Sequence, residues 1–458
     1  MGAEVYVDDY ARRSDGSAVL IGRFLHTLTY MNGATLTNAD TSQNDGFVVG
    51  LDPSSNGQWA VQISSTSAVL PIAVRPTPDG GSIVIGNVFT NTSSDPYAFG
   101  NIDTFNTNAT TSGFIGKIDS SGGVVWVDKL DGPSGSGHLV NSVAVDPVTG
   151  EVFATGQSSG ISQTLTTMQP MGVTTGVNVA MGSGVWYAHI GTDGLPKTQS
   201  MWQNGSVPPG LHIALGNDGT RYLFGSYIGA FPAVPLMTVP SAAPSNDGFL
   251  VTLDTNDKPT AAFVYGADDR DDYPIDAGFR ADGRLVVLFE SDAITATPTK
   301  PFKAGSLVMD PSLFAAGKGY VVAELDPSNR NGLWGQVIAL PTSPFQQTAR
   351  LTIADDAPLL SLMIRQGQTN IGAKTFTLKG DDSLFVTLDP TTGAPTSAYM
   401  IDGPSTDSAF LVRAGCSDTI VGNFQSDLVT FGTDTFTPLI PNVILSARSN
   451  RLAFTPIP

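Results

Sequence analysis

The chain has 458 residues, of which 14% are charged, and its 41 acidic and 23 basic residues give a formal net charge of −18. This acidic balance excludes nucleic acid as a partner, because proteins that bind a phosphate backbone carry a basic surface. No run of about 18 apolar residues is present, which excludes membrane insertion through a helix, while 41% hydrophobic residues suffice for a folded core.

The first residues and the cysteine count bear on the compartment. Met1–Tyr10 has no basic segment followed by an apolar run, so we expect no signal peptide in this sequence. Cys416 is the single cysteine, which excludes an intramolecular disulfide and a zinc site built on cysteines. Few lysines and many Ser, Thr, Asn and Gly residues favour a secreted or cell-surface protein whose leader is absent here. An intracellular protein is the alternative.

A strand that ends in an acidic tight turn recurs along the chain at intervals of 59–72 residues. The first copy is GFVVGLDPSSNG, which turns at Asp52. A second signal keeps the same register, because an aromatic residue follows each turn. The turn positions are Asp52, Asp119, Gly191, Asp254, Asp326, Asp389 and Arg448, and the aromatic positions are Trp59, Trp126, Trp202, Phe263, Trp334, Tyr399 and Phe454.

Each unit opens with two further strands joined by a tight turn, as in SVAVDPVTGEVFATG (Ser142–Gly156). The order within a unit is therefore strand a, turn, strand b, long connection, strand c, turn and strand d. No stretch has sustained helical periodicity, so helices should be scarce. The predicted units are residues 1–68, 69–139, 140–208, 209–272, 273–346, 347–406 and 407–458.

These repeats predict an all-β fold, namely a seven-bladed β-propeller of four-stranded antiparallel blades that forms one domain over residues 1–458. The strand order starts and ends in phase with the repeat, which favours closure of the ring from blade to blade. In the alternative closure, the N-terminal strand joins the last sheet. Tandem β-sandwiches and an open solenoid are the other architectures that fit the repeats.

Three kinds of segment resemble the bacterial β-propeller repeat proteins of the SBBP type: SVAVDPVTGEVFATG, FGTDTFT (Phe431–Thr437) and DGFVVGLDPSSNGQWA (Asp45–Ala60). The likeness covers essentially the whole chain, although the unit around Gly191 lacks the acidic turn residue. The resemblance implies a propeller that is mostly exported or surface-associated. It brings no catalytic residues to carry over.

The long connections between strands b and c should share one face of the molecule with the links between units. Long loops between rigid elements often carry binding residues, and aromatic side chains give a contact surface at low entropic cost. We therefore predict a binding surface for a protein or a glycan on this face. In the alternative, these aromatic residues pack the loops onto the sheets. The candidate residues are His26, Tyr30, Tyr97, Tyr227, Phe231, Phe302 and Phe314.

The acidic residues divide into two groups. Eight aspartates sit in tight turns, where a carboxylate accepts backbone N–H bonds: Asp52, Asp119, Asp146, Asp218, Asp254, Asp282, Asp326 and Asp389. A second group lies on one link between units and comprises Asp268, Asp269, Asp271 and Asp272. We expect no cofactor, and calcium at this second group is the alternative, since Ca²⁺ takes six to eight oxygen ligands.

Catalytic patterns are sparse. Gly156–Gly160 fits G-x-S-x-G, but the helix that this motif requires is not predicted after it, and no pattern places a histidine beside Ser158. A non-catalytic scaffold that binds a protein or glycan is therefore the first hypothesis for function. The second is a structural protein that assembles with copies of itself into a layer, shell or filament. A glycan hydrolase or lyase is the third.

Overall fold

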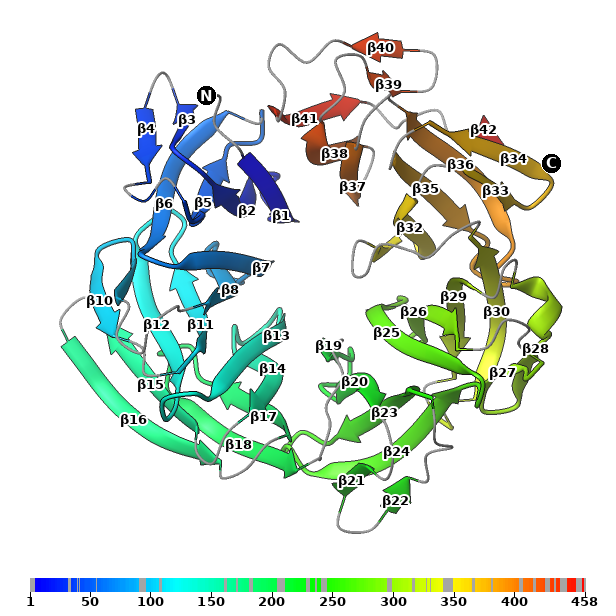
Figure 1. Cartoon of the computed structure of the whole chain (residues 1–458), viewed down its shortest axis with the longest axis horizontal. Helices are drawn as coiled ribbons and strands as arrows, with labels where there is room; N and C mark the ends of the chain where they lie inside the picture. The colour runs from blue at the N-terminus through cyan, green and yellow to red at the C-terminus, as the bar shows by residue number, and fades with distance from the viewer. Residues whose placement is uncertain are drawn as a thin grey trace. The chain divides into compact units, whose positions relative to one another are not determined.

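The computed structural model is all-β, as predicted (Figure 1), and one 3₁₀ turn, Pro311–Leu313, is the helix in its described part. The described residues are 5–31, 34–38, 40, 42–54, 56–89, 96–106, 109–159, 163–169, 172–180, 184–203, 211–227, 231–234, 237–239, 245–294, 299–314, 318–326, 328–329, 331–340, 349–364, 367–379, 382–402, 407–414, 417–424, 429–431, 434–436, 443–449 and 455–456. The chain forms two compact units, Met1–Val207 and Pro208–Pro458. Their boundary falls one residue from the predicted boundary between the third and fourth repeats.

The first compact unit contains three consecutive four-stranded antiparallel sheets that follow the predicted order of strands a to d. A short parallel pairing between β11 and β13 makes the second and third sheets continuous. The strands are β1 (Val5–Arg12), β2 (Ala18–Phe24), β5 (Asp45–Leu51) and β6 (Gly57–Ser65), then β7 (Ala68–Pro76), β8 (Ser82–Phe89), β11 (Thr111–Ile118) and β12 (Val124–Asp131), then β13 (Gly137–Val145), β14 (Val152–Ser159), β17 (Gly184–Ile190) and β18 (Pro196–Gln203).

The second compact unit repeats the same pattern, with three four-stranded sheets followed by a three-stranded one. The strands are β19 (His212–Leu215), β20 (Arg221–Tyr227), β23 (Asp247–Leu253) and β24 (Pro259–Gly266), then β25 (Arg270–Phe279), β26 (Leu285–Ala293), β29 (Lys318–Leu325) and β30 (Gly332–Ala339), then β31 (Arg350–Ala354), β32 (Ala357–Ile364), β35 (Asp382–Leu388) and β36 (Pro395–Asp402), then β37 (Asp407–Ala414), β38 (Ser417–Phe424) and β41 (Val443–Ser449).

The final strand differs from the prediction. Phe454, which was expected in the fourth strand of the last sheet, lies outside the described residues. The described strand that follows it, β42 (Thr455–Pro456), pairs with β36 of the preceding sheet rather than with β41. The pairing joins Thr455 to Ala398 and Pro456 to Ser397.

The long connections between strands b and c also differ from the prediction, because each one contains a β-hairpin where a loop was expected. The hairpins are β3 (Thr27–Met31) with β4 (Ala34–Thr37), β9 (Pro96–Phe99) with β10 (Ile102–Asn106), β15 (Gln163–Gln169) with β16 (Gly172–Ala180), β21 (Phe231–Val234) with β22 (Met237–Val239), β27 (Phe302–Ala304) with β28 (Leu307–Met309), β33 (Gly367–Ile371) with β34 (Lys374–Leu378), and β39 (Val429–Phe431) with β40 (Asp434–Phe436). Their period-2 sequences, such as TLTYMNGATLT, are typical of strands and satisfy backbone groups that a loop would leave open.

Four of these hairpins pair with the outermost strand of the preceding sheet. β9 pairs with β6, β15 with β12, β27 with β24, and β39 with β36. A hairpin of one repeat therefore extends the sheet of the repeat before it, which is β-strand addition within a single chain.

The tight turns confirm the predicted role of their aspartates. All eight carboxylates accept a backbone N–H within the same turn. Asp119, for example, accepts from the amides of Ser121 and Gly123, both at 2.8 Å. These bonds hold each turn between two strands in a fixed shape.

The aromatic residue after each turn joins consecutive sheets. The Trp59 Nε1 donates to the carbonyl oxygen of Ser120 at 3.0 Å, and the Trp126 Nε1 donates to that of Thr192 at 3.0 Å. Each acceptor lies in the turn between strands c and d of the next sheet. The indole covers a glycine of that turn, Gly122 or Gly194, both with positive φ. A Cβ there would lie 2.8 Å from the ring, so the turn requires glycine for its backbone and for its space.

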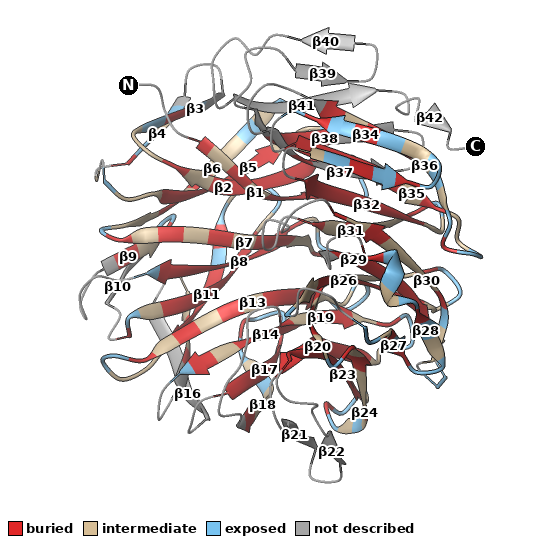
Figure 2. Cartoon of the chain, turned by 45° about the vertical axis from the view of Figure 1, so that its right-hand side comes forward, coloured by how far each residue is buried: buried red, intermediate tan, exposed pale blue. Residues whose placement is uncertain are grey.

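The core lies between adjacent sheets, where the central strands are buried along their length (Figure 2). Trp126 is fully buried with Leu130, Val140 and Trp186, between the second and third sheets. Trp202, Trp334 and Tyr399 occupy the same slot and are also buried.

We expect Trp126→Ala to lower the free energy of unfolding by about 3–5 kcal/mol, since it leaves a cavity in a packed core. Urea unfolding followed by far-UV circular dichroism measures this change. Trp126→Phe keeps a ring but removes the donor to Thr192, and it should fall between the parent and the alanine variant. A loss below about 1 kcal/mol for Trp126→Ala would contradict the proposed role of this slot.

Candidate functional site

The structure buries most of the aromatic residues that were predicted to form a binding surface. Tyr97, Tyr227, Phe302 and Phe314 are at most 5% exposed. Their rings pack on the sheets: Tyr97 contacts Phe114 with centroids 6.5 Å apart, and Phe302 meets Phe289 at 5.3 Å. These four side chains therefore belong to the core. They are buried rather than exposed, as in the alternative in which the aromatic residues pack onto the sheets. Tyr97 and Phe302 lie on the inserted hairpins, whereas Tyr227 ends β20 and Phe314 follows the 3₁₀ turn.

Of the other three candidates, the structure describes the side chain of His26. His26 has a φ of 68° and is half-buried, and its carbonyl oxygen accepts from the Asn38 amide at the base of the β3–β4 hairpin. Tyr30 and Phe231 lie on β3 and β21, and their side chains are outside the described part of the structure.

The four aspartates considered for calcium do not converge on one point. The Asp269 Oδ2 accepts from the amides of Thr299 and Lys300 at 2.6 and 2.9 Å. Asp271 accepts from the backbone and side-chain nitrogens of Asn246, both at 2.8 Å, and Asp268 is exposed. Within the described residues, no group of three or more His, Cys, Asp or Glu side chains is placed to hold a metal ion.

Asp272 differs from its neighbours because it is fully buried. Its Oδ2 accepts from the Ala267 amide at 2.7 Å. Burial raises the pKa of Asp272 to about 7, and the nearby charge of Asp247 raises it further, whereas Arg270 lowers it. The Arg270 guanidinium lies 3.8 Å from the centroid of the Phe314 ring. The segment from Asp268 to Asp272 is therefore packed against its neighbours through charged side chains.

One pairing was missed because the predicted boundary between repeats, after residue 139, separated two residues that lie on paired strands of one sheet. The Ser158 Oγ lies 2.9 Å from His138 Nδ1, and the Ser136 Oγ lies 2.9 Å from His138 Nε2. His138 is fully buried, and burial lowers its pKa to about 4. Both ring nitrogens are engaged by serine hydroxyls in the interior, so the serine of the G-x-S-x-G motif serves a buried hydrogen-bond chain. Its first glycine, Gly156, makes room for the Trp186 ring.

A groove of about 740 Å³ lies in the first compact unit, against the outer strand β6. Three segments form its walls: β6 itself, the β9–β10 hairpin that pairs with it, and the turn before β12. The lining residues are Thr37, Asp45, Ala60, Val61, Gln62, Ser64, Ser65, Thr66, Tyr97, Ala98, Gly100, Asn101, Gly122, Gly123 and Val124. Tyr97 is thus the one predicted binding residue that borders the groove.

The local sequence explains this lining. Side chains alternate along β6, where Val61 and Ile63 are buried in the core cluster, so that Gln62 and Ser64 take the opposite face. The glycines at 100, 122 and 123 contribute backbone to the lining. The hydrogen bond from Trp59 to Ser120 fixes the turn that forms the third wall.

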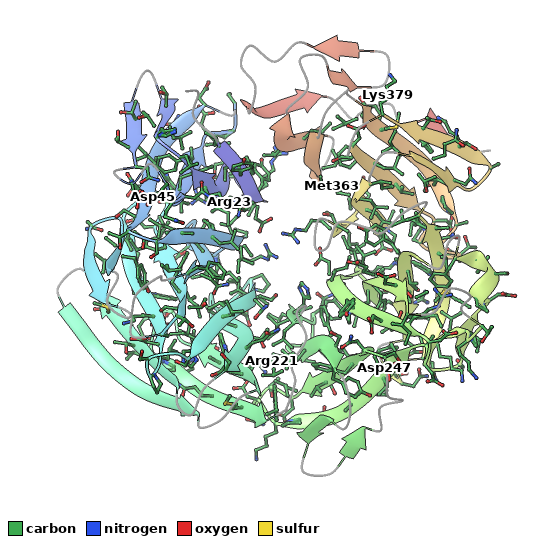
Figure 3. All side chains as sticks on the ribbon, in the orientation of Figure 1. Arg23, Asp45, Arg221, Asp247, Met363 and Lys379 are labelled. Atoms are coloured by element: carbon green, nitrogen blue, oxygen red, sulfur yellow. The ribbon has the colours of Figure 1, made fainter. Side chains whose placement is uncertain are left out.

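Asp45 is the charged residue of the lining, and it begins β5 (Figure 3). It is 2% exposed, and its carboxylate accepts from the Gln62 Nε2 at 2.6 Å and from the Ser65 amide at 3.0 Å. Burial raises the pKa of Asp45 to about 6, and these two hydrogen bonds oppose the rise. The Gln62 Nε2 also donates to the Thr37 carbonyl at 3.0 Å, so one amide on β6 is hydrogen-bonded to both β4 and β5.

No family model matches the chain, and no curated protein matches it. Among solved structures, it is similar to a puromycin hydrolase S511A mutant complexed with PGG, with 11% identity and a TM-score of 0.44 over 95% of this chain. The chain spans 53% of the length of that hydrolase.

A second similar structure is the dihydro-heme d1 dehydrogenase NirN in complex with DHE, with 12% identity and a TM-score of 0.37, covering 88% of this chain and 72% of that one. The quinohemoprotein alcohol dehydrogenase ADHIIG from Pseudomonas putida HK5 follows at 8% identity and 0.28, covering 92% and 73%. At these scores the likeness assigns neither an activity nor a cofactor to this chain. In the part of the chain that the structure describes, no helix has the length and apolarity to cross a membrane.

Asp45 should give the stability a distinct pH dependence. Its pKa of about 6 in the fold is higher than the 3.8 of an unperturbed aspartate, so the folded state retains this proton to a higher pH than the unfolded chain does. The contribution of Asp45 to stability therefore decreases as the pH rises from about 4 to 7, by at most about 3 kcal/mol. In urea unfolding, the stability of the parent relative to Asp45→Asn should fall over this range.

Asp389→Asn is the matched control with the opposite sign. The Thr392 amide lowers the pKa of Asp389, so the advantage of the parent over this variant should grow as the pH rises through about 4. A difference between the parent and Asp45→Asn that does not change with pH would contradict the raised pKa of Asp45.

Proposed function

We propose that this chain is a non-catalytic seven-bladed β-propeller scaffold, secreted or at the cell surface, that binds a protein or glycan partner. The repeated four-stranded antiparallel sheets support the propeller, and so do Trp59 and Trp126, which join the first three sheets through turns. In such a fold, each sheet covers the face of its neighbour.

The observation that carries the binding role is the composition of the β6 groove, by which we mean the groove lined by the residues named above. Hydroxyls, amides and backbone line it together with four aliphatic side chains, those of Ala60, Val61, Ala98 and Val124. Asp45 supplies its single carboxylate, and no lysine or arginine is among the lining residues. Such a surface offers hydrogen bonds to a neutral, hydroxyl-rich ligand and repels an anionic one. Between the two partner classes, this lining favours a neutral glycan.

The same lining argues against glycan hydrolysis. Glycosidases of the common type use two carboxyl groups that flank the scissile bond, one as acid and one as base or nucleophile. The β6 groove has Asp45 alone, and hydrogen bonds from Gln62 and Ser65 occupy its oxygens. We therefore favour binding without turnover.

A screen of neutral and sulfated oligosaccharides against the parent protein tests this proposal. We expect binding to a neutral glycan, and at least a tenfold loss of affinity when the double variant Ser64→Trp/Asn101→Trp fills the groove. Val148→Trp, at a turn residue that is 85% exposed, is the matched control and should bind like the parent.

Unchanged affinity in the double variant would rule out the groove as the binding site. Preference for sulfated over neutral glycans would contradict the charge argument. A protein partner that is lost in the same double variant would keep the site and change the class of ligand.

A further inference from the structure

The β15–β16 hairpin ends a sheet with an unusual strand. β15 pairs with β12 of the preceding sheet, and β16 is the terminal strand in the order of that sheet. β16 has nine residues, GVTTGVNVA, and pairs with β15 on one side among the described strands. No described strand is paired with its other side, although β18 lies close to part of β16. Within the described strands, this side therefore presents backbone N–H and C=O groups along an edge.

The outer strands of the other hairpins are short or charged, which are the usual means of preventing edge-to-edge pairing. β4, β22 and β28 have three or four residues. β10 contains Asp103, β34 contains Lys374, and β40 contains Asp434. β16 is longer than all of these and has no charged residue.

The surrounding sequence extends this contrast. From Val152 to Thr192 the chain contains no Asp, Glu, Lys or Arg, although 14% of the whole chain is charged. A net charge of −18 makes two copies repel each other over most of their surface. Repulsion between copies is weakest where the local charge is zero, and β16 lies in the middle of that stretch.

The register of β16 limits the segment that can accept a partner. Between Thr167↔Thr175 and Met168↔Val173 the pairing skips Thr174, and between Gln163↔Ala180 and Thr164↔Asn178 it skips Val179. Such bulges bend an edge and interrupt pairing. Thr175–Asn178 is the regular segment between them.

We propose that the β16 edge binds a second copy of this chain through antiparallel pairing of Thr175–Asn178 with itself. In this two-fold arrangement Thr175 lies opposite Asn178 and Gly176 opposite Val177, so the same segment supplies donors and acceptors on both sides. An isologous interface of this kind closes at two copies. The short segment makes the dimer weak, so it forms at high protein concentration.

Analytical ultracentrifugation of the full chain over a concentration series tests the proposal. The parent should shift from the 47.7 kDa monomer towards twice that mass as concentration rises. Thr175→Lys/Asn178→Lys places like charges directly opposite each other across the two-fold axis and should keep the chain monomeric, at least tenfold weaker in association. Val148→Lys/Leu313→Lys adds the same charge at exposed sites and should dimerise like the parent.

Hydrogen exchange of the unmodified parent gives a second measurement that does not depend on a variant folding. The amides of residues 175–178 should become more protected at high concentration than at low concentration. A parent that remains monomeric throughout the series would overturn the proposal. Dimerisation that the β16 and control variants alter equally, or without added protection at 175–178, would overturn it as well.

Discussion

Consecutive sheets are joined where an indole ring covers a glycine of a tight turn. Trp59 on Gly122 and Trp126 on Gly194 each combine ring packing with one hydrogen bond from Nε1 to a carbonyl oxygen. The contact needs both residues in phase, since any Cβ on the glycine would displace the ring. The groove depends on the same contact, because the turn that Trp59 holds is one of its walls.

The inserted hairpins form a second junction, and they decide where polar and apolar side chains go. When β9 pairs with β6, Tyr97 turns inward and is covered, while the hydroxyls and amides of β6 remain along an open groove. The proposed binding surface therefore combines polar groups with small aliphatic side chains, where a surface of aromatic residues was expected. Burial raises the pKa of its one acid, Asp45, while the hydrogen bonds from Gln62 and Ser65 oppose that rise.

Much of the local structure could be predicted because its signals are local. The turn at Asp119 is specified within five residues, and the two strands that it connects are adjacent to it in the sequence. The partners of the hairpins were not predictable in this way, since β9 pairs with a strand formed more than thirty residues earlier and no residue marks that choice. The contact between Ser158 and His138 was missed for a different reason. The predicted repeat boundary separated the two residues, although they lie on paired strands of a single sheet.

The backward pairing of the hairpins also imposes an order on how the chain completes itself. The sheet that ends with β6 receives β9 only after residues 96–99 of the next repeat have been made, and β12 waits in the same way for β15. During synthesis each sheet that ends in β6, β12, β24 or β36 thus has an open outer edge until the following repeat pairs with it. Because a hairpin of one repeat belongs to the sheet of the repeat before it, truncating the chain between two such repeats leaves the sheet on the N-terminal side incomplete.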